Sequence, residues 1–244
     1  MCWIGLIKHK DEAFEKFQIF KALVENELDL KIKCLRSDRG GEYTSNEFLE
    51  FCEQHGIKRQ FSVAGTPQQN GVAKRMNRTV QQMSRAMLDD SGTPDTFWGE
   101  AAHTIVNILN KAHVRVNSDK TPYELWYGNP PTVKHFRVFG SICFIKNNDE
   151  KLGKFESRAD EGILLGYSSR SRAYKCYNKR LRKIVERIDV VIDESPAAPK
   201  EEKQTTYEDD DDIYPYTSNR NDIDNEPNEN PEYDLSEKAP SRYV

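Results

Sequence analysis

Two residues of this 244-residue chain decide whether it could bind a catalytic metal ion: Asp38, at the end of a predicted strand, and Lys74, near the start of a predicted helix. Asp38 follows an apolar strand pattern and leads into Gly40-Gly41. Lys74 is separated from it by 35 residues and lies in a segment, residues 66–79, typical of a helix start. A carboxylate is a hard oxygen ligand for Mg²⁺, although one alone holds the ion weakly, and an ammonium group cannot ligate a metal. On local pattern alone, Asp38 is a turn residue at a strand end and Lys74 is a solvated helix lysine.

Both segments resemble the integrase core of copia-type LTR retrotransposons, which is part of their Pol polyprotein. The likeness rests on Arg-Ser-Asp-Arg-Gly-Gly-Glu-Tyr at residues 36–43 and on Thr-Pro-Gln-Gln-Asn-Gly at residues 66–71. The resemblance implies that an Asp and a Glu at this spacing, with one Asp further upstream, bind two catalytic Mg²⁺ or Mn²⁺ ions. Asp38 matches the second acidic position, Lys74 occupies the Glu position, and the upstream Asp has no counterpart because the chain begins too late.

The lysine at position 74 predicts that this copy has lost its chemistry. Two unit charges about 4 Å apart interact by roughly 4 kcal/mol at an effective dielectric near 20, so the ammonium would repel a metal ion and attract Asp38. We therefore expect an Asp38–Lys74 ion pair, an incomplete metal site at Asp38 and no bound ion. Glu42 could be nominated as a substitute ligand, but its place after two glycines favours a solvent-facing side chain.

A polar stripe follows one side of the helix predicted from residue 66 onward, and such a stripe could contact phosphates. With neighbouring amides that could hydrogen-bond DNA, the nucleic-acid-binding residues expected from the resemblance are Gln68, Gln69, Asn70, Lys74, Arg78, Gln81 and Arg85. The alternative is the solvated face of an amphipathic helix, which periodicity alone favours. The basic stretch at residues 179–183, expected to be a strand, has the same two interpretations.

Strands and helices alternate in the first 65 residues, an order that implies a sheet covered by helices. The pattern predicts strands at Cys2–Lys8, Leu30–Leu35 and Ile57–Phe61, and helices at Asp11–Leu28 and Ser45–His55. Because the predicted core lacks the family's first strand, we expect one edge or face of its sheet to lack a neighbour.

Three further helices are predicted between residues 66 and 127. The first has a capping box of Thr66 and Gln69 with Pro67 at the first helical position. Its apolar stripe consists of Val72, Met76, Val80, Met83 and Met87. The other two helices are expected at residues 95–112 and 121–127.

Short strands dominate after Pro131, at residues 138–145, 161–167, 173–177 and 183–191. Strands at this spacing fit a small barrel. This block also resembles the family, whose core is followed by a small β-barrel of Src-homology-3 type. The resemblance therefore runs from about Trp3 to Glu194.

Composition divides the chain into a basic body and an acidic end. Residues 196–244 carry 5 Lys and Arg against 14 Asp and Glu, whereas residues 1–195 carry 31 against 26. The acidic segment cannot bury enough apolar surface to order itself, so a disordered tail is predicted, and the basic body is compatible with a nucleic-acid partner. Five cysteines without close pairs favour reduced thiols in an intracellular protein. No apolar run is long enough to span a membrane.

These patterns predict an α/β protein in three parts: a ribonuclease-H-like integrase core lacking its first strand at residues 1–130, a small Src-homology-3-like β-barrel at 131–195, and a disordered acidic tail at 196–244. The activity that the resemblance implies is DNA integration by metal-dependent phosphoryl transfer, and we expect this copy to be inactive. The expected partners are DNA and other integrase subunits or the reverse transcriptase of the same polyprotein, in the nucleus if the protein is functional. The alternatives are an enzyme that works within a longer polyprotein or with a complementing subunit, a non-catalytic nucleic-acid-binding remnant, and a protein-interaction module that uses the acidic tail.

Overall fold

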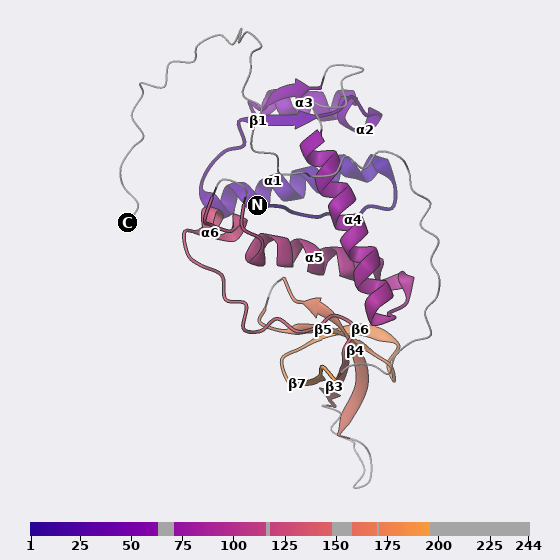
Figure 1. The fold of residues 1–244 in the computed structure, drawn as a ribbon. Helices are drawn as coiled ribbons and strands as arrows, with labels where there is room; N and C mark the ends of the chain where they lie inside the picture. The colour runs from indigo at the N-terminus through magenta and orange to yellow at the C-terminus, as the bar shows by residue number, and fades with distance from the viewer. Residues whose placement is uncertain (63–70, 116–117, 148–157, 170, 196–244) are drawn as a thin grey trace, which may run out of the picture. The chain divides into compact units, whose positions relative to one another are not determined.

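The computed structural model describes residues 1–62, 71–115, 118–147, 158–169 and 171–195, and Met1–Pro199 form one compact unit. Helices and strands are both present (Figure 1), which confirms the predicted mixed α/β class. The helices are α1 (Ala13–Leu28), α2 (Gly41–Thr44), α3 (Asn46–Gln54), α4 (Gly71–Ser91), α5 (Trp98–Ala112) and α6 (Pro122–Tyr127). The strands are β1 (Cys34–Ser37), β2 (Lys58–Phe61), β3 (Ile142–Lys146), β4 (Ala159–Tyr167), β5 (Tyr174–Asn178), β6 (Lys183–Arg187) and β7 (Val190–Asp193). The domain boundaries expected near residues 130 and 195 stay predictions.

A two-stranded parallel sheet of β1 and β2 packs with α1 and α3 in the N-terminal part of the chain. Phe48 and Cys52 of α3 are fully buried there together with Ile57. The local sequence explains the limits of α3: the Ser45 hydroxyl accepts a hydrogen bond from the backbone N–H of Phe48, and Gly56 follows the helix with a left-handed φ of 65°. The helices and the strand predicted at these places are confirmed.

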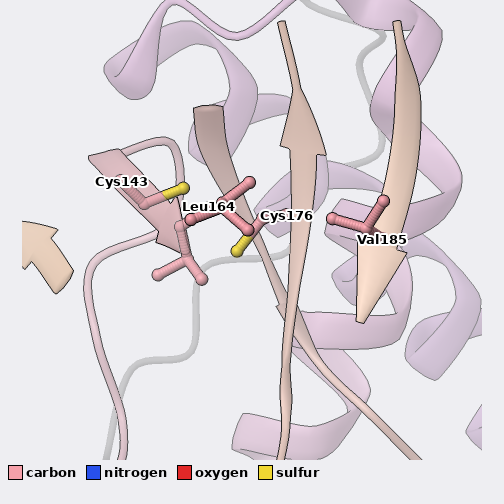
Figure 2. Close-up of a cluster of buried hydrophobic side chains, with 5 residues drawn as sticks. Cys143, Leu164, Cys176 and Val185 are labelled. Carbon is pink, nitrogen blue, oxygen red and sulfur yellow. The ribbon is translucent and has the colours of Figure 1, made fainter. Parts of the chain in front are cut away.

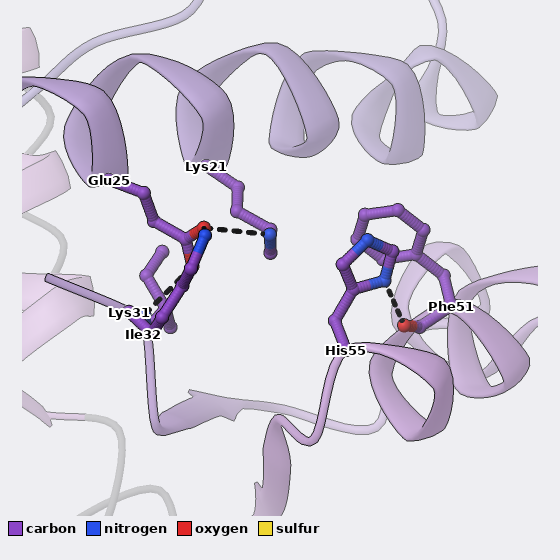
Figure 3. A network of polar contacts seen from close by, with 6 residues as sticks. All are labelled: Lys21, Glu25, Lys31, Ile32, Phe51 and His55. Atoms are coloured by element: carbon purple, nitrogen blue, oxygen red, sulfur yellow. Dashed lines mark hydrogen bonds and ion pairs between the residues drawn. The ribbon is translucent and has the colours of Figure 1, made fainter. Parts of the chain in front are cut away.

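The strand predicted at Leu30–Leu35 begins four residues later, as β1, and is mostly exposed. Figure 3 shows why: the carboxylate of Glu25 in α1 accepts a hydrogen bond from the backbone N–H of Ile32 at 2.9 Å. The backbone N–H of Ile32 is therefore tied to α1, and contact with the neighbouring strand starts at the Lys33 carbonyl, which accepts a hydrogen bond from the Lys58 N–H at 2.9 Å. Two ammonium groups within 3.0 Å complete this network, those of Lys21 and Lys31. The Ile32 N–H and these two charges lower the pKa of Glu25 to about 2.

The segment Cys2–Lys8 has no regular secondary structure, so the strand predicted there is wrong. One side chain of α5 explains the difference. Asn110 accepts a hydrogen bond from the backbone N–H of Cys2 at 2.8 Å and donates one to the Cys2 carbonyl at 2.7 Å. Ile4 then packs on the cluster between α4 and α5, and Leu6 lies against Gly99. Because Asn110 takes both backbone hydrogen-bonding groups of Cys2, the start of this segment is held on α5 and not on a neighbouring strand.

Helix α5 contacts α4, α6 and β4, so it connects the helical region to the C-terminal sheet. Its apolar face meets α4 through Ala102, Ile105 and Val106. Helix α6 begins at a capping box in which Thr121 and Glu124 exchange hydrogen bonds. Both helices match their predictions, whereas the capping box expected at residues 66–69 lies outside the described residues. None of the helices in the described part of the chain is long and apolar enough to cross a membrane.

The C-terminal sheet is antiparallel, with five strands in the order β6-β5-β4-β3-β7. Its core contains Cys143, Leu164, Cys176 and Val185 (Figure 2), and all five cysteines of the chain are free. The single strand predicted at residues 183–191 is wrong, because the chain bends after β6. Since β6 pairs with β5 and β7 pairs with β3, one straight strand could not reach both sides of the sheet. The strand predicted at 138–145 also starts later, at Ile142.

Strand β4 approaches α5 closely at Gly166. This glycine has a φ of 134°, and a Cβ on it would lie 2.2 Å from the hydroxyl oxygen of Thr104. The Thr104 hydroxyl donates a hydrogen bond to the carbonyl of Leu165 at 3.1 Å. The sheet and α5 are therefore joined through a site that only glycine fits.

Candidate functional site

Asp38 lies one residue beyond the end of β1 and is exposed. Its Oδ1 accepts a hydrogen bond from the backbone N–H of Gly40 at 3.2 Å, a turn typical of Asp before glycine. The preceding residue is fixed in the sheet, since the Ser37 carbonyl accepts from the backbone N–H of Ser62 at 3.1 Å. The carboxylate thus projects from a well-held strand end, and the local interpretation of Asp38 as a turn residue describes its contact correctly.

Arg59 of β2 holds this strand end in place, a role that sequence reasoning did not find. One guanidinium nitrogen donates to the Ser37 hydroxyl and to the Tyr43 carbonyl, each at 3.0 Å. The guanidinium also lies over the rings of Phe48 and Phe61, at 4.7 and 4.8 Å from their centroids. Arg59 therefore ties both strands, α2 and α3 together directly beneath Asp38. The run Lys58-Arg59-Gln60 carries no local signal that singles out Arg59, because the partners of its guanidinium come from other elements.

Two carboxylates lie around the turn that follows β1. Glu42 is half-buried rather than solvent-facing, and its carboxylate lies over Gly40, 2.8 Å from where a Cβ would be. Burial, with the negative charges of Glu42 and Asp38, raises the pKa of the Tyr43 hydroxyl, while Arg59 opposes the shift. Within the described residues, no group of three His, Cys, Asp or Glu side chains is arranged to hold a metal ion.

Lys74 lies in the first turn of α4 and is exposed. Between these two described residues, no ion pair joins its ammonium to the carboxylate of Asp38. The ion pair expected from the resemblance is therefore absent, and the first turn of α4 instead presents this charge to solvent. Whether positions 38 and 74 correspond to the family's metal-binding positions stays a prediction.

One face of α4 carries the polar stripe expected to contact nucleic acid. The side chains are spaced by four, three and four residues, which places them on the same side of the helix. All are exposed, and they are Lys74, Arg78, Gln81 and Arg85. The structure brings these four predicted residues together, whereas the other three, Gln68, Gln69 and Asn70, lie outside the described residues.

The apolar stripe predicted for α4 is covered only in part, and Met83 in its C-terminal half is 36% exposed. Val80 is buried against α5, and Leu88, which the predicted stripe did not include, is buried against the C-terminal sheet. Val72 and Met76, nearer the start of the helix, are 75% and 39% exposed. The first half of α4 thus leaves α5, so its polar stripe is accessible from several directions.

Residues 179–182 of the basic stretch form the turn between β5 and β6, and only its last residue, Lys183, belongs to a strand, as the first residue of β6. Two of its charges are used within the fold: Arg180 pairs with Asp160 at 2.7 Å, and Lys179 pairs with Glu161. The backbone of the turn is held as well, because the Leu181 N–H donates to the side chain of Asn178. These contacts favour a structural role for the first half of the stretch.

Comparison with known proteins finds several that are similar to this chain. A family model described as a retroviral polymerase SH3-like domain matches residues 141–206, which include the five-stranded sheet. The Pol polyprotein of transposon TNT 1-94 from Nicotiana tabacum is 39% identical over 193 residues, 79% of this chain. This chain is a relative of the retrotransposon Pol polyproteins. Transposon RE2 of Arabidopsis thaliana encodes another, 30% identical over 174 residues, 71% of the chain.

This chain spans only 14% and 12% of the length of those two polyproteins. Two solved structures are also similar. A simian T-cell lymphotropic virus intasome, solved with a PP2A regulatory subunit, has a TM-score of 0.43 at 17% identity and covers 70% of this chain and 59% of its own. The HTLV-2 integrase catalytic core, solved with magnesium, has a TM-score of 0.39 at 21% identity and covers 50% and 72%. These two likenesses are too distant to carry an argument about this chain.

Proposed function

We propose that this chain is an integrase segment of a retrotransposon Pol polyprotein that binds nucleic acid through α4 and has no phosphoryl-transfer activity of its own. Its core is ribonuclease-H-like, its C-terminal sheet is a Src-homology-3-like barrel, and the ancestral activity is insertion of element DNA into a host genome. The observation that carries the proposal is the charge of α4: an exposed ammonium, Lys74, begins a stripe that continues with two guanidinium groups.

The residues present do not fit the metal pair that DNA integration needs. Two divalent ions about 4 Å apart clamp the attacking and leaving oxygens, and carboxylates must neutralise and hold them. The positions that the resemblance assigns to metal ligands hold one carboxylate, Asp38, and one ammonium group, Lys74. The ammonium supplies no lone pair while it is protonated and adds a repulsive positive charge. Mg²⁺ or Mn²⁺ is therefore a cofactor of the ancestral enzyme and not of this chain.

The cations on α4 suit the phosphate backbone of DNA. Lys74, Arg78 and Arg85 are exposed on one face, and none makes an ion pair with another residue in the described part of the chain. Contacts of this kind release condensed counterions, so they give affinity that falls steeply with salt and does not depend on base sequence. Gln81 on the same face adds an amide that can hydrogen-bond to phosphate or sugar.

A strand-transfer assay on element-end oligonucleotides tests the loss of chemistry. We expect no 3′-processing or strand-transfer products with Mg²⁺ or Mn²⁺ from the wild type or from Lys74→Glu. The substitution supplies only two of the three carboxylates that the family uses, because the third has no counterpart in these 244 residues. Products from the unmodified chain that need metal and disappear in Asp38→Ala would overturn the proposal.

Fluorescence anisotropy with labelled duplex DNA tests the binding surface. Reversing two charges, in Arg78→Glu with Arg85→Glu, should weaken binding at least tenfold at low salt, because two phosphate contacts become repulsive. Lys16→Glu with Lys58→Glu is the matched control, since both lysines are exposed on other elements. Equal losses in the two double variants would show that net charge, and not this face of α4, determines binding.

The partners and location of the protein follow from the same proposal. We propose that the chain acts beside other integrase subunits or the reverse transcriptase of its polyprotein, inside the cell and in the nucleus when it meets chromosomal DNA. The interaction hypothesis for the acidic segment depends on residues 196–244, which lie outside the described part of the chain.

A further inference from the structure

A polar cleft of about 750 Å³ lies between α5, the connection from α6 to β3, and the turn between β4 and β5. Its volume falls in the range of roughly 300–1,000 Å³ that is usual for small-molecule sites. The cleft is formed by different residues from the polar stripe of α4. Its lining is unusual for a space between a helix and a sheet, because charged and polar side chains dominate it.

Helix α5 contributes one complete polar face to this cleft. The side chains recur at intervals of three, one, three and four residues, and they are Glu100, His103, Thr104, Asn107 and Lys111. A helix face turned toward another element is ordinarily apolar, as the opposite face of α5 is where it meets α4. Two members of this face have partners within the fold, since the Thr104 hydroxyl donates to the Leu165 carbonyl and Glu100 pairs with Lys175. The side chains of His103, Asn107 and Lys111 make no hydrogen bond or ion pair with another described residue, so these three polar groups are open to a polar ligand.

The walls of the cleft carry more positive than negative charge, even after the ion pair between Lys175 and Glu100 is taken into account. Lys175 of β5 is neutralised by Glu100, with 3.0 Å between Nζ and Oε2. Three other cationic side chains line the cleft, and in the described part of the chain none of them makes an ion pair or a hydrogen bond with another side chain. They are Lys111, Lys134 and Arg172. The cleft thus combines uncompensated cations with partial exclusion of water.

The titration of the lining groups agrees with an electropositive, partly desolvated environment. Burial lowers the pKa of the Lys111 ammonium. Burial, together with the charge of Lys175, lowers the pKa of His103, and burial with Lys111 and Arg137 lowers that of His135. An anion bound among these groups would offset the cost of holding their charges away from water.

Aromatic rings on the same walls give the cleft flat apolar surfaces. Lys111 lies over the ring of Tyr123, 5.7 Å from its centroid. The hydroxyl of Tyr174 donates to the His135 carbonyl at 3.0 Å, and the Tyr167 hydroxyl is hydrogen-bonded to the backbone of Arg137. Two of the rings are therefore held in place by their hydroxyls. Rigid aromatic faces next to cations are the features on which nucleotide bases stack in nucleic-acid-binding proteins.

We propose that this cleft binds a nucleotide, with its phosphates at Lys111, Lys134 and Arg172 and its base against the tyrosine rings. The nucleotide has two possible sources, a free nucleoside triphosphate or one unit of a single-stranded nucleic acid, and both present the same phosphate and base. The site is separate from α4, and so is independent of the function proposed above.

Isothermal titration calorimetry on the full chain tests the proposal with three probes: ATP, inorganic pyrophosphate and an oligothymidine of eight nucleotides. ATP should bind more tightly than pyrophosphate, because only ATP brings a base to the rings. Lys111→Gln and, separately, Arg172→Gln should each weaken ATP binding about tenfold or more, the loss expected for one charge-assisted contact. Arg172 is exposed, so its variant tests the site without disturbing the interior.

Matched controls separate this site from general charge and from α4. Lys183→Gln removes one exposed positive charge from β6 and should leave ATP binding unchanged. Arg78→Glu with Arg85→Glu should also leave ATP binding unchanged, while it weakens binding of duplex DNA if the function proposed for α4 is correct. If the oligonucleotide binds and ATP does not, and Lys111→Gln abolishes binding of the oligonucleotide, the cleft is a site for a nucleotide unit of a single-stranded nucleic acid. Absence of binding by all three probes at millimolar concentration, or equal affinity in wild type and both cleft variants, would overturn the proposal.

Discussion

Replacing Arg59 by methionine should destabilise the fold around Asp38 more than any change to an exposed residue of the same sheet. The guanidinium makes two hydrogen bonds to oxygen, at the Ser37 hydroxyl and the Tyr43 carbonyl, and a longer one of 3.7 Å to the sulfur of Cys52. Hydrogen bonds from a charged donor contribute about 1.5–3 kcal/mol each, and stacking over two rings adds about 0.5–2 kcal/mol. Arg59→Met also removes a buried Nε–H that has no partner among the described residues, and this removal stabilises the variant by about 1–3 kcal/mol. We therefore expect the free energy of unfolding to fall by about 3 kcal/mol.

Urea denaturation of the full chain, followed by circular dichroism, measures this change. Arg59→Lys should lose part of the stability, because an ammonium keeps the charge but cannot reproduce the flat, forked contact. Arg36→Met is the matched control: this arginine is exposed on β1, and its replacement should change stability by less than about 0.5 kcal/mol. If Arg59→Met and Arg36→Met have the same free energy of unfolding, the contacts of Arg59 do not stabilise the end of β1, and the prediction is refuted.

Three further predictions concern other parts of the chain. The pKa of Glu25 is depressed to about 2, so its contribution to stability is present above its ordinary pKa of 4.5 and is lost as the pH falls toward 2. Glu25→Gln should remove this pH dependence from acid-denaturation curves, and an unchanged curve would contradict the network with Ile32. Gly166→Ala should lower the free energy of unfolding by about 2 kcal/mol or more in the same urea denaturation, because the positive φ is strained for alanine and the new methyl meets Thr104. Gly41→Ala, with open space around it, should lower it by less than about 0.5 kcal/mol, and equal losses in the two variants would contradict the close approach at Gly166. Deleting residues 196–244 removes 14 acidic against 5 basic residues and should strengthen duplex-DNA binding at low salt, and equal affinity with and without the segment would show that its charge does not reach the binding surface.

The sequence by itself determined the elements whose limits depend on near neighbours. Helix α3 starts at Ser45 and stops at Gly56 because a hydroxyl satisfies a free N–H and a glycine adopts a left-handed φ. Helix α6 follows the same logic at Thr121 and Gly128. The apolar periods of α1 and α5 were equally visible, and the motif around Asp38 identified the relationship to Pol polyproteins before any fold was known.

Only the tertiary structure decided where backbone groups find partners far along the chain. Cys2–Lys8 has the composition of a strand, but Asn110 takes both hydrogen-bonding groups of Cys2 from 108 residues away. The start of β1 is likewise set by Glu25, whose carboxylate takes the N–H of Ile32. A local pattern indicates which secondary structure a segment can form. The structure of Cys2–Lys8 and the start of β1 depend in addition on side chains of α5 and α1.

The same distinction applies to the candidate sites. Periodicity placed Lys74, Arg78, Gln81 and Arg85 on one face of a helix, because side chains three and four residues apart point the same way. It could not show that Arg59 secures the strand end beneath Asp38, nor that a polar face of α5 meets cations from two distant loops. Those arrangements exist only where segments separated in sequence pack together, since burial and charge compensation depend on every element that surrounds a group.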